Sequence, residues 1–137
     1  MKIWHCYRFT VAKMDKELTI LIADRNGHVR DFLKREMMAE GYKIRVAKNA
    51  KEVLKWVFHH DPIHLVVLDP DLPDSDEVPL LEKINDRIPT LPVVIHAFSL
   101  ETTIPPEILN KVIFVEKLGN SIEHLKKVVS ETLRRSK

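Results

Sequence analysis

The hydrophobic residues of the chain fall into five short apolar runs that alternate with segments of helical spacing. Residues 18–23, 64–68, 92–97 and 112–115 show little polar alternation, which is typical of strands buried on both faces of a parallel sheet. Residues 42–46 alternate apolar and charged side chains. We therefore expect this run to form a half-exposed strand near an edge of the sheet.

The segments between these runs carry the apolar stripes of amphipathic helices. The stripes consist of Val29, Phe32, Leu33 and Met37, then Val53, Leu54, Val57 and Phe58, then Val78, Leu81 and Ile84, and finally Ile122, Leu125, Val128, Val129 and Leu133. Gly41 follows the first stripe, where a helix would end. Asn49 offers an N-cap to the second helix, with Glu52 three residues later. A helix after the fourth strand can begin only at Pro105–Pro106.

Strand and helix thus alternate five times after residue 17. This order predicts an α/β fold, a doubly wound parallel sheet with helices on both faces. We assign residues 18–137 to this domain and residues 1–17 to an N-terminal extension. In such sheets, ligands bind at the carboxyl ends of the strands.

Composition narrows the class of protein. The chain has 137 residues, of which 45% are hydrophobic and 31% charged, which suits one globular domain. No apolar run approaches the roughly 20 residues needed to span a bilayer, so we expect no membrane association. Lys and Arg number 22 and Asp and Glu number 20, so bulk charge gives no support for nucleic-acid binding.

Two residue types exclude further classes. The single cysteine, Cys6, cannot form a disulfide within the chain, and no signal-peptide pattern is present. A cytoplasmic location is therefore expected. The chain has only three glycines, and they are too far apart for the phosphate-binding loops of P-loop enzymes or dinucleotide oxidoreductases.

Three charged residues follow the predicted strands. Asp24 follows the first strand, Asp69 the third and Lys117 the fifth. Carboxylates supply the hard oxygen ligands that divalent cations prefer, and an ammonium group neutralises phosphate charge. A carboxylate can also attack a phosphoryl donor and become an aspartyl phosphate.

Four segments carry a resemblance to a known family. Residues 20–24, 65–76, 91–95 and 114–117 resemble the receiver domain of two-component response regulators, over about residues 18–135 in all. The resemblance implies a flavodoxin-like (βα)5 fold with strand order 2-1-3-4-5. It also implies a role in phosphorelay signal transduction.

The resemblance gives several residues a role. Asp69 is the expected phosphoacceptor, with a histidine kinase or a phosphotransfer protein as the donor. Mg²⁺ is the expected cofactor, held by Asp24, Asp69 and the backbone carbonyl of Asp71. Lys117 matches the lysine that contacts the phosphoryl group, and Phe114 matches an aromatic switch position.

The chain departs from the family pattern at several positions. Arg25 replaces the second acidic residue of the pair, and Ala97 replaces the Ser or Thr that contacts the phosphoryl group at the other switch position. Glu77, Leu118 and Pro105–Pro106 are also atypical. Mg²⁺ prefers about six oxygen ligands, so the arginine weakens the expected metal site. We hypothesise that Arg25 pairs with Asp24 or Asp69 and takes over part of the neutralising role of the metal.

Two functions follow from these matches and departures. The first is a stand-alone receiver that is phosphorylated on Asp69, is not an enzyme, and signals through a protein partner. The partner would dock on the fourth helix, the fifth strand and the last helix, and we also consider a homodimer. The alternative is a pseudo-receiver, a protein-interaction module that does not depend on phosphorylation. Arg25 and Ala97 favour this second function.

Other motifs receive plainer interpretations. Asp69-Pro70-Asp71 is similar to the nucleophile motif of haloacid-dehalogenase-like phosphatases, but it follows the wrong strand for that family. We expect His59 and His60 to be a solvated cluster. We expect His96 to be an interior histidine with its hydrogen bonds made. The acidic residues Asp74, Asp76 and Glu77 are expected to form a solvated turn.

Overall fold

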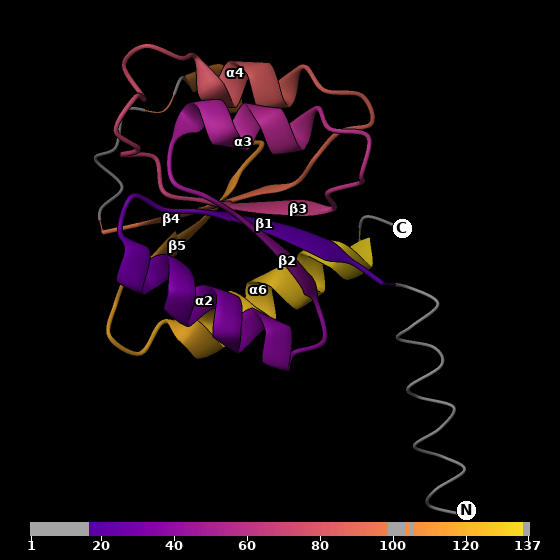
Figure 1. The fold of residues 1–137 in the computed structure, drawn as a ribbon, viewed down its shortest axis with the longest axis vertical. Coiled ribbons are helices and arrows are strands. Elements are labelled where there is room, and N and C mark those ends of the chain that lie inside the picture. The colour runs from indigo at the N-terminus through magenta and orange to yellow at the C-terminus, as the bar shows by residue number, and fades with distance from the viewer. Residues whose placement is uncertain (1–16, 99–103, 105, 136–137) are drawn as a thin grey trace, which may run out of the picture.

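The computed structural model describes residues 17–98, 104 and 106–135. The expected extension, apart from Glu17, lies outside the described residues. Five strands form one parallel sheet in the order β2-β1-β3-β4-β5, as predicted (Figure 1). The strands are β1 (Thr19–Ala23), β2 (Lys43–Ala47), β3 (Leu65–Leu68), β4 (Val93–Ala97) and β5 (Ile113–Glu116).

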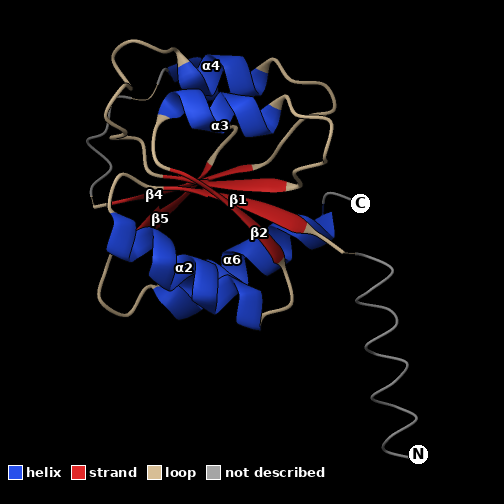
Figure 2. Ribbon diagram, viewed as in Figure 1, coloured by secondary structure: helices blue, strands red, loops and turns tan. Residues whose placement is uncertain are grey.

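Helices cover both faces of the sheet, which gives the three-layer arrangement of a doubly wound fold. The helices are α2 (Gly27–Ala39), α3 (Ala50–Val57), α4 (Leu80–Asn85), α5 (Pro106–Leu109) and α6 (Ile122–Arg135). Figure 2 shows α2 and α6 on one face and α3 and α4 on the other. In the part of the chain that is described, no helix is both long and apolar enough to cross a membrane.

The strands alternate their side chains between two hydrophobic cores. On β1, Leu21 packs under α3 and α4, whereas Ile20 and Ile22 pack under α2 and α6. On β4, Ile95 and Val94 divide in the same way. Because a strand residue two positions further on returns to the same face, this alternation fixes which way the residues at the strand ends point.

Several predicted helix ends are confirmed. The Asn49 side chain accepts a hydrogen bond from the backbone N–H of Glu52 at 2.9 Å. Gly41 follows α2 with a φ of 99°, a conformation that glycine adopts most easily. Helix α5 begins at Pro106, as the proline pair required.

The acidic turn after β3 differs from the expectation. Asp74 is not simply solvated, because its carboxylate accepts hydrogen bonds from the backbone N–H groups of Ala50 at 2.6 Å and Lys51 at 3.1 Å. The loop therefore caps the first turn of α3. Helix α4 begins at Leu80, so the predicted stripe residue Val78 lies before the helix.

Candidate functional site

Backbone pairing continues one residue past three of the strands and fixes the positions of the predicted site residues. Asp24, Asp69 and Lys117 each donate their backbone N–H to a carbonyl of a neighbouring strand, at 3.2, 2.8 and 2.7 Å. Because the strands are parallel, all three residues stand at the same end of the sheet.

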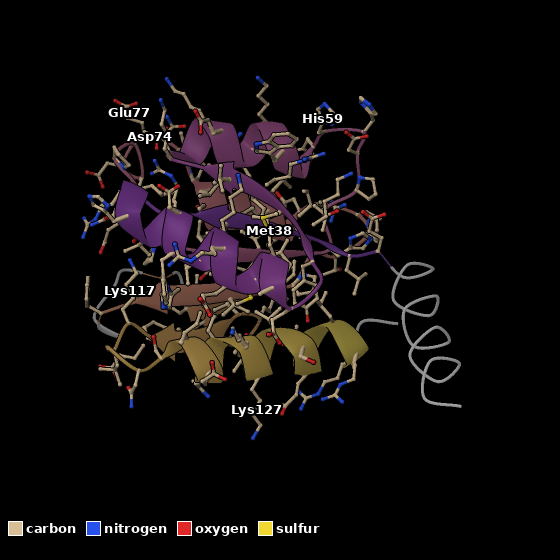
Figure 3. All side chains as sticks on the ribbon, turned by 60° about the horizontal axis from the view of Figure 1, so that its bottom comes forward. Met38, His59, Asp74, Glu77, Lys117 and Lys127 are labelled. Atoms are coloured by element: carbon tan, nitrogen blue, oxygen red, sulfur yellow. The ribbon has the colours of Figure 1, made fainter. Side chains whose placement is uncertain are left out.

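The side chains of these three residues converge. The Nζ of Lys117 lies 2.8 Å from Oδ2 of Asp24 and 3.8 Å from Oδ2 of Asp69. Both aspartates are buried, and the lysine side chain is only 9% exposed. Figure 3 shows Lys117 towards the same end of the molecule as Asp74 and Glu77, which lie in the loop after β3. The structure therefore brings two carboxylates and one ammonium group together in a single site at the strand ends, the pocket of this receiver-like sheet.

Arg25 binds Asp69 rather than Asp24. Its backbone N–H donates to Oδ2 of Asp69 at 3.2 Å, and its Nε lies 3.8 Å from the same oxygen. The guanidinium Nη1 donates to the backbone carbonyl of Asp71 at 3.4 Å. The Arg25 side chain is half exposed, whereas the Asp69 side chain that it contacts is buried.

Two loop residues and one residue of α2 hold the two aspartates in place. The backbone N–H of Asp71 donates to Oδ1 of Asp69 at 3.0 Å, and the backbone N–H of Asn26 donates to Oδ1 of Asp24 at 2.9 Å. The side chain of Arg30 donates to the backbone carbonyl of Asp24 at 2.7 Å. Sequence reasoning missed the roles of Asn26 and Arg30. The N-cap preference of Asn before a helix was a signal for Asn26, which also caps α2.

The residues present fit a magnesium ion poorly. The oxygen donors expected for the ion, the carboxylates of Asp24 and Asp69 and the carbonyl of Asp71, are all in place. However, the guanidinium of Arg25 lies against two of these donors, and Lys117 is bonded to the third. Two carboxylates are thus matched by two cationic side chains, so a divalent ion would add unbalanced positive charge.

Comparison with known proteins identifies the family of the chain. A family model described as the response regulator receiver domain matches residues 20–111. The chain belongs to this family. It is therefore a receiver domain of the kind found in two-component response regulators, as the resemblance predicted.

Curated relatives of this receiver are longer proteins. The chain is 35% identical over 77 residues to the DNA-binding transcriptional regulator NtrC of Rhizobium meliloti, a match that covers 56% of this chain and 16% of that protein. It is 35% identical over 86 residues to response regulator RR06 of Streptococcus pneumoniae, covering 63% of this chain and 39% of that protein. The chain thus spans less than half the length of either relative.

Solved receiver structures share the fold over most of the chain. Response regulator TrrA of Thermotoga maritima, in complex with Mg(2+)-BeF, superposes with a TM-score of 0.73 at 25% identity, covering 83% of this chain and 97% of TrrA. A two-component response regulator from Clostridium difficile gives 0.72 at 27% identity, with coverages of 88% and 98%. A complex of histidine kinase ThkA with TrrA gives 0.69 at 27% identity, with coverages of 85% and 97%.

The two predicted switch positions of the receiver lie in the core under α3 and α4. Ala97 is buried there and carries no hydroxyl group, and Phe114 packs against the same core. The neighbouring Phe98, which sequence reasoning missed, is 68% exposed, and its ring centre lies 5.3 Å from Nζ of Lys117. This contact is a cation–π interaction at the edge of the pocket.

His96 is an interior histidine, as expected, but the expectation that its hydrogen bonds are made was wrong. His96 is buried on β4, and among the described residues neither of its ring nitrogens has a hydrogen-bond partner. Burial, and to a smaller extent the charge of Lys117, lower the pKa of His96 to about 4, and the charge of Asp69 opposes part of this shift. The imidazole is therefore neutral at pH 7.

The histidine pair lies away from this pocket. Figure 3 shows His59 towards the opposite end of the molecule from Lys117. The ligand atoms of His59, His60 and Asp61 lie within 4.8 Å of one another at the surface. The Nδ1 of His59 already accepts the backbone N–H of Asp61 at 3.1 Å, so this cluster fits the solvated arrangement that was expected.

Proposed function

We propose that this receiver accepts a phosphoryl group on Asp69 and passes the signal to a protein partner. The observation that carries the proposal is the contact of one ammonium group, Nζ of Lys117, with both buried carboxylates. A buried cation between two acids, at the strand ends where ligands bind, is the arrangement that phosphoryl transfer to a carboxylate needs.

The chemical step is a displacement at phosphorus. A carboxylate oxygen of Asp69 forms a bond to the phosphorus of a phosphohistidine, and the phosphorus–nitrogen bond breaks. The electron pair of that bond goes to the leaving imidazole nitrogen, which is then protonated. Lys117 and Arg25 both lie near Oδ2 of Asp69 and can neutralise the charge that builds up on the transferred group.

Arg25 has two parts in this step. Its side chain covers Asp69, which is only 2% exposed, so the guanidinium must move aside to admit the donor. The half-exposed side chain can do so without disturbing the core. After transfer, its fixed charge and planar donors suit a phosphoryl oxygen, so Arg25 supplies positive charge that a metal ion would otherwise supply.

The proposed donor is a histidine kinase or a phosphotransfer protein. The ThkA–TrrA complex is of this kind, and its regulator has the same fold as this chain.

The proposed downstream partner is a protein that docks on α5, β5 and α6. Leu109 at the end of α5 and Leu118 after β5 are more than half exposed, which gives this face apolar contact area. Three further expectations stay predictions: that residues 1–17 form an extension, that the protein forms a homodimer, and that it is cytoplasmic.

The second candidate function is a pseudo-receiver that binds a partner without phosphorylation. The same arginine favours it, because a pocket that is already neutral has less need of a further ligand. The missing hydroxyl at Ala97 favours it as well. In this case Asp69 would serve only to hold Arg25 and the loop after β3.

Phosphorylation of the whole chain separates the two candidates. The protein is incubated with acetyl phosphate, or with a phosphorylated phosphotransfer protein, and followed on a phosphate-affinity gel. We expect a shifted band that hydroxylamine removes, as an acyl phosphate requires. We expect no shift for Asp69→Asn, and an unchanged shift for Asp76→Asn, a control in the same loop. Absence of the shift with every donor would leave the pseudo-receiver.

A further inference from the structure

His96 is a polar side chain that the protein buries without a hydrogen bond. It is 5% exposed, and neither Nδ1 nor Nε2 has a partner within the described part of the chain. Buried polar groups are nearly always hydrogen-bonded, so each exception needs an explanation. Val94, two residues earlier on the same strand, shows that an apolar side chain fits this face of the sheet.

The register of the sheet places His96 next to the proposed phosphoacceptor. Val67 on β3 pairs with Val94 on β4. Two residues further along both strands, Asp69 stands opposite His96. Val67 and Val94 both face the core under α2 and α6, so the alternation of strand side chains directs Asp69 and His96 to this same side.

Lys117 passes over the end of the strand that carries His96. The lysine follows β5 at one edge of the sheet, and its ammonium reaches Asp24 beyond β1. Strands β4 and β3 lie between these two positions, so the lysine side chain crosses the end of β4. The charges of Lys117 and Asp69 both act on the imidazole, as expected for a group near these two side chains.

In the free protein the ring of His96 makes no hydrogen bond to Asp69 within the described part of the chain. Oδ1 of Asp69 accepts the backbone N–H of Asp71, and Oδ2 accepts the backbone N–H of Arg25 and lies 3.8 Å from Nζ of Lys117. A phosphoryl group on this carboxylate would bring strong acceptor oxygens into the same pocket.

We propose that His96 donates a hydrogen bond from its neutral imidazole to an oxygen of the phosphoryl group on Asp69. The inference rests on the proposed function, because it needs an anion at Asp69. The bond gives the imidazole the partner that it lacks in the free protein. It also ties β4 to the anion from residue 96, whereas Ala97 next to it has no hydroxyl group with which to do so. In this proposal His96 contacts the transferred group directly.

Nuclear magnetic resonance of the histidine rings tests the contact directly. The probe is beryllofluoride, a mimic of the phosphoryl group, added to the ¹⁵N-labelled full chain with and without Mg²⁺. Fluorine spectra report whether the probe binds, and Asp69→Asn shows whether it binds at Asp69. We expect the ring nitrogens of His96, assigned by their loss in His96→Gln, to shift on binding. The ring nitrogens of His124, an exposed histidine on α6, should not move.

Affinity for the same probe separates a contact from a merely structural role. His96→Val fills the space without a donor, and we expect it to bind beryllofluoride about ten-fold more weakly. His96→Gln keeps an N–H group and should recover part of the affinity. His124→Gln is the control that should match the unchanged protein.

The outcomes distinguish this inference from the proposed function. Binding at Asp69 with unmoved His96 signals and an unchanged affinity of His96→Val would overturn the role of His96 and leave the proposed function standing. No binding of beryllofluoride under either metal condition would argue against the phosphoacceptor itself, and the role of His96 would fall with it.

Discussion

Two cationic side chains stand on one oxygen of the proposed phosphoacceptor. Lys117 Nζ and Arg25 Nε each lie 3.8 Å from Oδ2 of Asp69, and Lys117 also pairs with Asp24. Opposite charges at these separations attract one another. A carboxylate can act as a nucleophile toward a phosphoryl donor. The negative charges of the two aspartates are therefore balanced by side chains of the protein itself.

His96 predicts a pH dependence of folding stability. Its pKa is about 4 in the folded protein, against an ordinary value of 6.5, because burial disfavours the charged imidazole. Between these two values the unfolded chain binds the proton and the folded chain does not, so stability falls as the pH falls. From pH 7 to pH 5 the loss from this group is about 2 kcal/mol.

Urea denaturation of the unchanged protein and of His96→Leu at both pH values measures this loss. The leucine variant lacks the titrating group. From pH 7 to pH 5, the free energy of unfolding of the unchanged protein should therefore fall by about 2 kcal/mol relative to that of the variant. An equal pH response in the two proteins would show that His96 is not buried in the neutral form.

At the scale of elements, the loop after β3 is fastened to the start of α3. Asp74 accepts the backbone N–H groups of Ala50 and Lys51. Burial alone would raise the pKa of Asp74, but these hydrogen bonds and the charge of Lys51 outweigh burial and lower it. The loop that begins with Asp69 therefore depends on a neighbouring helix for its conformation.

Removing this cap should destabilise the protein. Asp74→Ala leaves two N–H groups at the start of α3 without their acceptor, and we expect a loss of about 1 kcal/mol in the free energy of unfolding. Asp76→Ala, which removes an exposed acid of the same loop, is the matched control and should change little. Chemical denaturation at pH 7 gives both numbers, and equal stabilities of the two variants would exclude the cap.

Elements with a local signal could be predicted from the sequence. Apolar runs gave all five strands, and Gly41 and Asn49 marked the end of one helix and the start of another, because these residues act on the backbone next to them. The cap from Asp74 to Ala50 spans 24 positions of the sequence and depends on the path of a loop. Nothing local to Asp74 encodes that path.

The site also has parts that follow from strand order and parts that depend on the placement of side chains. Parallel strands place their carboxyl ends together, so the convergence of Asp24, Asp69 and Lys117 followed from strand order alone. The choice of Asp69 over Asp24 as the partner of Arg25 depends on side-chain positions that strand order does not specify. The missing hydrogen bonds of His96 could not be predicted either, because the hydrogen-bond partners of a buried side chain depend on where the neighbouring strands lie.

At the scale of the whole molecule, one lysine joins the two helices that cover the site face. Lys126 on α6 donates to Glu36 on α2 at 3.0 Å and lies 3.6 Å from Glu40. The hydrogen bond to Glu36 is the main cause of the raised pKa of Lys126. The bridge therefore joins α2, the helix after Arg25, to α6, the helix after Lys117.

Lys126→Gln should lower the melting temperature slightly, and by less at high salt, because an ion pair near the surface is screened. Lys127→Gln, at the next position of α6, is exposed and serves as the control. Thermal unfolding at low and high ionic strength gives the comparison. A melting temperature of Lys126→Gln equal to that of Lys127→Gln at low salt would show that the bridge contributes nothing.

The metal requirement of phosphorylation at Asp69 tests most directly whether Arg25 supplies the positive charge of a metal ion. The unchanged protein, Arg25→Asp and Arg25→Gln are labelled with acetyl phosphate in the presence of Mg²⁺ and in the presence of a chelator. We predict that the unchanged protein keeps most of its labelling without metal, because Arg25 and Lys117 supply the positive charge. Arg25→Asp, with one more carboxylate and one cation fewer, should be labelled only with Mg²⁺, and Arg25→Gln should be labelled poorly without it. The role of Arg25 would be contradicted if the unchanged protein lost its labelling in chelator to the same extent as Arg25→Asp.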